Sequence, residues 1–167
     1  MSDTIQVGDL SIAHDFSGPE DAPLVVLSHS LAADKSMWAP QIPVLTERYR
    51  VLAYDHRGHG ETEAAPAPYT MEQLAGDAAG LIEALDVAPV LFVGLSLGGM
   101  VGQILGADHA DTVSALVLCD TASIMPTDIW EERINGARAQ GMAALAQPTS
   151  ERWFTAPFHE RAPEIVE

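Results

Sequence analysis

The sequence is poor in cysteine and in positive charge. Its 167 residues include one cysteine and eight lysines and arginines, against 24 aspartates and glutamates. The single thiol, Cys119, ends an apolar run, where we expect it to be buried. One cysteine forms no internal disulfide and no cysteine metal cluster. The formal charge of −16 at pH 7 repels phosphate backbones, so nucleic acid is not an expected partner.

Long apolar runs and a basic leader are also missing. No apolar stretch approaches the roughly 20 residues that cross a bilayer, and MSDTIQVGDL at the start holds no basic residue ahead of an apolar segment. We therefore expect no membrane partner and a cytoplasmic location. His56 and His59 stand three apart in a glycine turn without a third and fourth ligand at useful spacing, so we expect no metal and no cofactor. Asp55 and Arg57 are expected to tie that turn down.

What the sequence does have is an alternation of short apolar runs and longer amphipathic ones. Residues 4–16 alternate around a Gly-Asp turn and predict an antiparallel hairpin. After residue 23, four strands alternate with three helices. The strands are expected at 24–28, 50–55, 89–94 and 113–119, and the helices at 38–48, after the T-M-E-Q capping box that begins at residue 70, and at 98–109. This order predicts the α/β class with a mostly parallel sheet.

The pattern changes at Ile124-Met125-Pro126. Only helical signals follow: a helix from about residue 128 to 146, a break at Pro148-Thr149-Ser150, and a second helix that Ser150 caps. We therefore expect a sheet domain of about six strands over residues 1–125 and the beginning of a helical cap over residues 126–167.

One short motif carries chemistry. Gly94-Leu95-Ser96-Leu97-Gly98 lies between an expected strand and an expected helix, where G-x-S-x-G predicts a nucleophile elbow. The turn is so sharp that larger side chains beside the serine collide with backbone. Ser96 is the candidate nucleophile, and the amides of Leu97 and Leu31 are the candidate oxyanion donors. For His29, at the end of the first parallel strand, we expect hydrogen bonds that fix the neighbouring loop.

Several longer segments support a resemblance. They are LSHSLAADKSMWAPQIP, VLAYDHRGHGET, FVGLSLGGMVGQILG, LVLCDTAS, IWEERI and ERWFTAPF. The chain resembles the α/β-hydrolase superfamily and, more narrowly, the 3-oxoadipate enol-lactonases of the β-ketoadipate pathway of aromatic catabolism. This resemblance implies an α/β-hydrolase fold and a small lactone or ester substrate that carries a carboxylate.

The resemblance also implies roles for individual residues. Ser96 would attack the lactone carbonyl, and Ser30, Trp130 and Arg133 would bind the substrate. Trp130 and Arg133 are three residues apart on one helical face. A surface salt bridge is the alternative role for Arg133.

Members of the resembling family continue beyond residue 167 with two more strands, which carry the catalytic acid and histidine. We therefore expect a fold that is incomplete at its C-terminal side and a chain that is inactive alone, because a serine without its histidine is a poor nucleophile. Asp120 is an alternative acid, or a residue that caps the turn after strand 113–119. That strand becomes an uncharged sheet edge, through which we expect self-association.

Three other functions remain open at this point. A general carboxylesterase and a cofactor-free haloperoxidase share the same frame and serine. A non-catalytic ligand-binding fragment would keep the pocket without a working triad. A substrate panel separates the enzymes from one another, and a serine-reactive probe separates them from the binding fragment.

Overall fold

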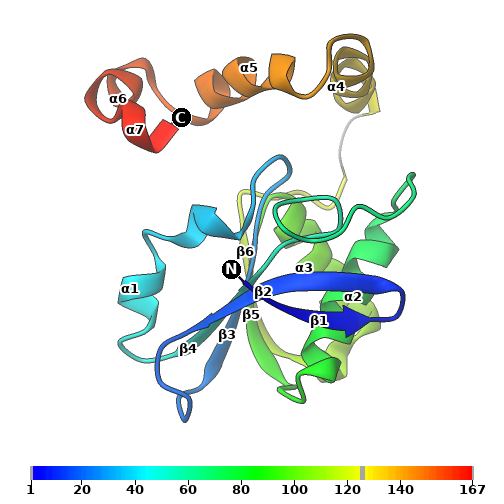
Figure 1. Cartoon of the computed structure of the whole chain (residues 1–167), viewed down its shortest axis with the longest axis vertical. Helices are drawn as coiled ribbons and strands as arrows, with labels where there is room; N and C mark the ends of the chain where they lie inside the picture. Colours follow the sequence, from blue (N-terminus) through cyan, green and yellow to red (C-terminus); the bar gives the residue numbers. More distant parts are fainter. Residues whose placement is uncertain (1, 125–126, 167) are drawn as a thin grey trace. The chain divides into compact units, whose positions relative to one another are not determined.

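The computed structural model describes residues 2–124 and 127–166 (Figure 1). Contacts divide the chain into two compact units, Met1–Ser123 and Ile124–Glu167. The domain boundary expected between residues 125 and 126 falls outside the described residues. Each unit is therefore described by itself.

A six-stranded sheet forms the first unit. Its strands are β1 (Asp3–Val7), β2 (Leu10–Ser17), β3 (Leu24–Ser28), β4 (Arg50–Tyr54), β5 (Val90–Leu95) and β6 (Val113–Cys119). They lie in the order β1-β2-β4-β3-β5-β6. The pairs β1–β2 and β2–β4 are antiparallel, and the pairs β3–β4, β3–β5 and β5–β6 are parallel. The expected N-terminal hairpin and mostly parallel sheet are confirmed.

Helices lie on both faces of this sheet (Figure 1). One face packs against α2 (Met71–Ala84) and α3 (Leu97–Asp108), burying the larger apolar cluster around Phe92 and Tyr54. The other face packs a smaller cluster under Trp38, from the short helices η1 (Lys35–Trp38) and α1 (Ile42–Leu45). A single turn, η2 (Ala110–Thr112), leads into β6. Burial on both faces explains the continuous apolar runs of the parallel strands.

The helix expected over residues 38–48 is wrong as a single element. The structure has η1 and α1 in its place, with residues 39–41 between them. Pro40 lies in this gap and Pro43 in the first turn of α1, where a missing backbone N–H removes no helical hydrogen bond. The capping box is confirmed, because the Gln73 amide donates to Thr70 Oγ1 at 3.2 Å and the Thr70 amide donates to Gln73 Oε1 at 2.9 Å.

The second unit is helical, as expected, but its breaks lie elsewhere. Its helices are α4 (Thr127–Gln140), α5 (Ala143–Trp153), α6 (Ala156–Arg161) and α7 (Pro163–Val166). Gly141 ends α4 in the left-handed conformation, with φ of 80°, and its amide donates to Ala137 O at 2.8 Å. Pro148 and Ser150 lie inside α5, so the predicted break and cap are wrong. The helix breaks at Gly141 and not at Pro148, because a residue with a positive φ cannot continue an α-helix.

The strand β6 is one of the two edges of the sheet, and β1 is the other. Among the described strands β6 pairs only with β5, and its Val117 and Leu118 side chains are 53% and 41% exposed. Cys119 at its end is half-buried, which corrects the expectation of a buried thiol. No helix in the described part of the chain is long and apolar enough to cross a bilayer.

Candidate active site

Ser96 lies in a strained turn between β5 and α3. Its backbone has φ of 53° and ψ of −107°, a region that L-residues avoid at a cost of roughly 1–3 kcal/mol. The glycines of the motif make this turn possible. A Cβ on Gly94 would lie 2.1 Å from Gly98 O, and a Cβ on Gly98 would lie 2.2 Å from Ser28 O. Glycine is therefore required at both positions, as the sequence motif predicts.

Hydrogen bonds hold the backbone of Ser96 on both sides. Its amide donates to Cys119 O at 2.9 Å. Its carbonyl accepts from the Met100 amide at 3.0 Å and from Thr121 Oγ1 at 2.7 Å. Thr121 was not recognised from the sequence. Its only signal is its place directly after β6 in the LVLCDTAS segment.

The loop after β3 lies against the same turn. The Gly98 amide donates to His29 O at 3.1 Å, and Leu31 packs partly buried against the core cluster that includes Leu97. Within residues 2–124 neither the Leu31 amide nor the Leu97 amide donates a hydrogen bond to protein. Leu97 is the first residue of α3, where an N–H without a helical partner is available to an anion.

His29 is fully buried and uses both ring nitrogens within the protein. Nδ1–H donates to Ser30 O at 2.8 Å, and Nε2 accepts from the His56 amide at 3.0 Å. Burial lowers the pKa of His29 to about 4, so the ring is neutral at pH 7. His29 holds the loop to the turn after β4, which is the role expected for it.

Two more histidines pack beside His29. Their ring centroids lie 4.5 Å (His56) and 5.2 Å (His59) from its own. His59 Nδ1–H donates to Arg57 O at 3.1 Å and its Nε2 accepts from the Ala32 amide at 3.4 Å. Like the His29 hydrogen bonds, these contacts connect the loop after β3 to the turn after β4. In the described part of the chain, no three side chains are grouped to ligate a metal.

His56 forms a serine–histidine pair with Ser28, which is sealed from solvent. Its Nε2 lies 3.0 Å from Ser28 Oγ, which lies 3.0 Å from Tyr54 OH. Burial lowers the pKa of His56 well below its usual value. Because Ser28 is fully buried, no substrate reaches this pair, and its role is to stabilise the strand ends behind the elbow.

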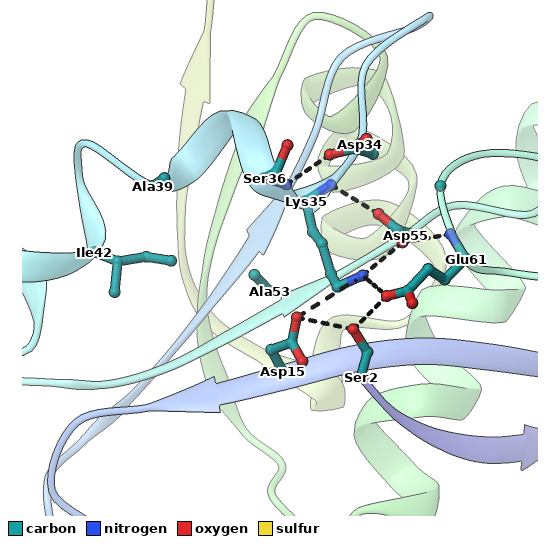
Figure 2. A pocket seen from close by; sticks show the side chains of 11 residues that line it. Ser2, Asp15, Asp34, Lys35, Ser36, Ala39, Ile42, Ala53, Asp55 and Glu61 are labelled. Carbon is teal, nitrogen blue, oxygen red and sulfur yellow. Dashed lines mark hydrogen bonds and ion pairs between the residues drawn. The ribbon is translucent and has the colours of Figure 1, made fainter.

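Asp55 connects the loop to the turn after β4 and lines a pocket of about 400 Å³ (Figure 2). One carboxylate oxygen accepts from the Lys35 amide at 2.7 Å. The other accepts from Lys35 Nζ at 2.8 Å and from the Glu61 amide at 2.9 Å. Arg57 pairs with Asp77 of α2 through two nitrogens at 2.5 Å. Asp55 and Arg57 therefore tie down the turn, as predicted.

The remaining predicted site residues fall in different places. Asp120 is exposed, with φ of 40°, and Ser30 Oγ donates to Leu31 O at 3.3 Å. Trp130 and Arg133 belong to the second unit, where the Arg133 guanidinium lies 5.4 Å from the Trp130 ring centroid. The shared helical face of this last pair is confirmed.

Within residues 2–123, no histidine hydrogen-bonds to Ser96 Oγ. His14 Nδ1 lies 3.5 Å from Ile12 O, His109 ends α3, and His159 Nε2 lies 3.3 Å from Ser150 O. Within the first unit, the candidate site therefore consists of the Ser96 hydroxyl and two free amides, with no histidine of that unit hydrogen-bonded to the serine.

Known proteins share this sequence and this architecture. The profile of the alpha/beta hydrolase fold family matches residues 23–154. The chain is 35% identical to 3-oxoadipate enol-lactonase 2 of Acinetobacter baylyi, over 100% of this chain and 63% of that protein.

Solved structures are similar as well. One is the enol-lactonase from Burkholderia xenovorans LB400, with a TM-score of 0.94 and 44% identity over 98% of this chain and 64% of that chain. Another is a thermophilic esterase from Thermogutta terrifontis, with a TM-score of 0.87 and 27% identity over 99% of this chain and 64% of that chain. The chain thus spans less than two thirds of the length of these relatives.

Proposed function

We propose that this chain, which belongs to the alpha/beta hydrolase fold family, carries the nucleophile and the oxyanion site of a hydrolase for carboxylic esters or lactones. The observation that carries the proposal is the strained turn at Ser96, with φ of 53°. Structures retain such strain where a reactive group must be held in one orientation. The free amides of Leu31 and Leu97 supply the second half of the chemistry.

The reaction begins when Ser96 Oγ attacks the carbonyl carbon and loses its proton to a base. The carbonyl oxygen becomes an oxyanion, and the amides of Leu31 and Leu97 donate to it. The bond from the carbonyl carbon to the leaving oxygen then breaks, and that oxygen takes up a proton. Water cleaves the resulting acyl-enzyme, releases the carboxylic acid and restores the serine.

The substrate that we propose is 3-oxoadipate enol-lactone, which is hydrolysed to 3-oxoadipate in the catabolism of aromatic compounds. Its support is that a 35% identical relative and a 44% identical solved structure are both named enol-lactonases. In this proposal Arg133 binds the free carboxylate of the lactone, Trp130 contacts its apolar part, and Ser30 lies beside the reacting end.

We further propose that the 167-residue chain by itself turns over esters very slowly. Loss of the partner histidine lowers kcat of a serine hydrolase on the order of 10⁶-fold, and no histidine within residues 2–123 hydrogen-bonds to Ser96 Oγ. Asp120 remains a proposed alternative acid, although it contacts no histidine ring among the described residues.

The direct test treats the chain and its Ser96→Ala variant with a fluorophosphonate probe, followed by intact-protein mass spectrometry. We expect slow, stoichiometric labelling of the native chain over hours and none of the variant. Enol-lactone consumption, followed by absorbance, should stay near the uncatalysed rate. Rapid turnover that is lost in Ser96→Ala would contradict the proposed low activity but support the proposed nucleophile.

The same material separates the alternatives. A panel of simple esters, the enol-lactone and a halide with peroxide distinguishes a general carboxylesterase and a haloperoxidase from an enol-lactonase. Binding of 3-oxoadipate by a folded chain whose Ser96 never reacts would instead support a non-catalytic binding protein.

The role of Arg133 is tested in any longer chain with measurable turnover. Arg133→Ala should raise KM for the carboxylated lactone about tenfold, the effect of losing one charged hydrogen bond, and leave KM for a neutral ester unchanged. Arg138→Ala, on the same helix α4, is the control. Equal changes for both substrates would point to a surface salt bridge or a folding role.

A further inference from the structure

Cys119, the last residue of β6, and Thr121, two residues later, hold the two peptide groups that flank the Ser96 Cα. On one side, the Ser96 amide donates to Cys119 O at 2.9 Å. On the other side, Thr121 Oγ1 donates to Ser96 O at 2.7 Å. The intervening Asp120 has φ of 40°, and this left-handed turn allows Cys119 O and the Thr121 hydroxyl to face the same serine.

Thr121 also packs against the start of α3. Its Cβ, Cγ2 and Oγ1 atoms lie 2.7–2.9 Å from the position that a Cβ on Gly99 would occupy. Gly99 therefore leaves the space that Thr121 fills. Next to it, Gln103 Nε2 donates to Ala122 O at 3.4 Å. The segment is attached to the helix at two points, so the threonine hydroxyl has little freedom to move away.

The hydrogen bond from the Thr121 hydroxyl to Ser96 O also affects the orientation of the Leu97 N–H. The carbonyl of Ser96 and the N–H of Leu97 belong to one planar trans peptide group, in which they point in opposite directions. The carbonyl accepts from Thr121 Oγ1 and from the Met100 amide at 3.0 Å. Two donors on one carbonyl fix the tilt of this plane, and the free Leu97 N–H on its other side is thereby aimed away from them.

We propose that Thr121 is a positioning residue of the nucleophile elbow: by orienting the Ser96–Leu97 peptide it aims the Leu97 amide at the oxyanion. The role rests on the proposed function of Ser96 and Leu97. A hydroxyl that sets the oxyanion donor acts on the acylation step, because the charge that Leu97 meets develops only in the transition state. It should leave binding of the neutral ester unchanged.

The test compares Thr121→Val, which keeps the shape but removes the donor, with Thr121→Ser, which restores the donor. Thr112→Val is the matched control, because Thr112 Oγ1 also donates to a backbone carbonyl, that of His109, at 2.8 Å.

Acylation of Ser96 by 4-nitrophenyl acetate is followed by mass spectrometry across ester concentrations. Thr121→Val should lower the maximal acylation rate about tenfold, short of the 10²-fold or larger loss on deleting an oxyanion donor. The half-saturating concentration should stay unchanged, with Thr121→Ser and Thr112→Val within twofold of the native chain.

A second readout, amide hydrogen exchange, does not depend on reactivity. Thr121→Val should accelerate exchange at Ser96 and Met100 at least tenfold more than at the middle of β5, and Thr112→Val should not. Unchanged acylation and exchange in Thr121→Val would overturn the proposal, as would equal effects of the two valine variants. If the native serine is never acylated, the proposed function fails and exchange alone decides whether Thr121 holds the turn. Should Thr121→Val not fold, Thr121→Ala replaces it.

Discussion

Single backbone positions decide whether the site of this molecule forms. Gly98 is the clearest case, because a Cβ there would lie 2.2 Å from Ser28 O, a backbone atom that cannot step aside. Overpacking against such an atom destabilises the fold. The motif glycines are thus explained by distances within the protein.

The first prediction follows from that contact. Gly98→Ala should lower the free energy of unfolding by about 2 kcal/mol or more. Gly76→Ala, in the middle of α2 with no atom within 4 Å of the added Cβ, should raise it by about 0.5–1 kcal/mol, since alanine favours helix. Urea titrations followed by circular dichroism give both values. A stable Gly98→Ala chain would mean that the β5–α3 turn is looser than described.

Asp120 supports a second prediction, which separates its two candidate roles. Its φ of 40° suits glycine and is tolerated by aspartate, whose short polar side chain can hydrogen-bond locally, whereas alanine is strained there by about 1–2 kcal/mol. Asp120→Gly should therefore keep stability and Ser96 labelling, while Asp120→Ala should lose about 1 kcal/mol in urea unfolding. If Asp120 is the acid of a triad, the glycine variant would instead lose reactivity while remaining folded.

At the scale of elements, β6 is an open edge of the sheet in the first unit. On the side of β6 away from β5, the backbone N–H and C=O groups have no further strand to pair with among the described strands. The sequence of β6, VSALVLC, carries no charge. Natural sheets protect such edges with lysine or proline. Self-association through β6 is therefore the expected behaviour of the 167-residue chain.

The third prediction tests this edge with one charge. Val117→Lys should shift the chain toward monomer in sedimentation velocity, because Val117 is 53% exposed on the edge strand. Val44→Lys is the matched control, since Val44 is a 67% exposed valine on α1. A native chain that sediments as a monomer at 100 μM would contradict self-association. An equal response of both variants would show that self-association does not depend on β6.

At the scale of the whole molecule, stability depends on histidines that are buried neutral. Burial lowers the pKa of His29 to about 4 and that of His56 well below its usual value. The unfolded chain binds these protons near pH 6.5, so it takes up more protons than the folded chain as the pH falls. The contribution of these two histidines to stability is fully present above pH 6.5 and is lost as the pH falls toward 4.

The fourth prediction states how steeply the free energy of unfolding falls with pH. Between pH 6.5 and pH 5 the free energy of unfolding should fall by up to about 1.4 kcal/mol per pH unit for each of the two histidines. Urea titrations at four pH values measure it, and His29→Gln should reduce the slope by about one proton. Since most carboxylates titrate below this range, a flat profile would show that these rings are solvated.

Patterns within short windows predicted much of this molecule. Alternating and continuous apolar runs gave the hairpin and the parallel strands, because strand burial repeats over two residues. The glycines around Ser96 predicted the sharp turn between β5 and α3, because G-x-S-x-G is a short contiguous motif, although the atom that requires glycine at residue 98 is the distant Ser28 O. The break at Gly141 was missed in favour of Pro148, because proline ordinarily interrupts a helix, whereas α5 continues through Pro148. Thr121, Lys35 and the Ser28–His56 pair were missed because their partners lie 20 or more residues away in sequence.

The bond from the Ser96 amide to Cys119 O also sets an order of assembly. The strained turn cannot be held until a strand 23 residues later in the chain has docked beside β5, so closure of that long loop precedes it. A nascent or partly unfolded chain would therefore expose an ordinary serine in a relaxed backbone. The strained geometry of Ser96 therefore belongs to a late stage of folding and forms only once β6 has joined the sheet beside β5.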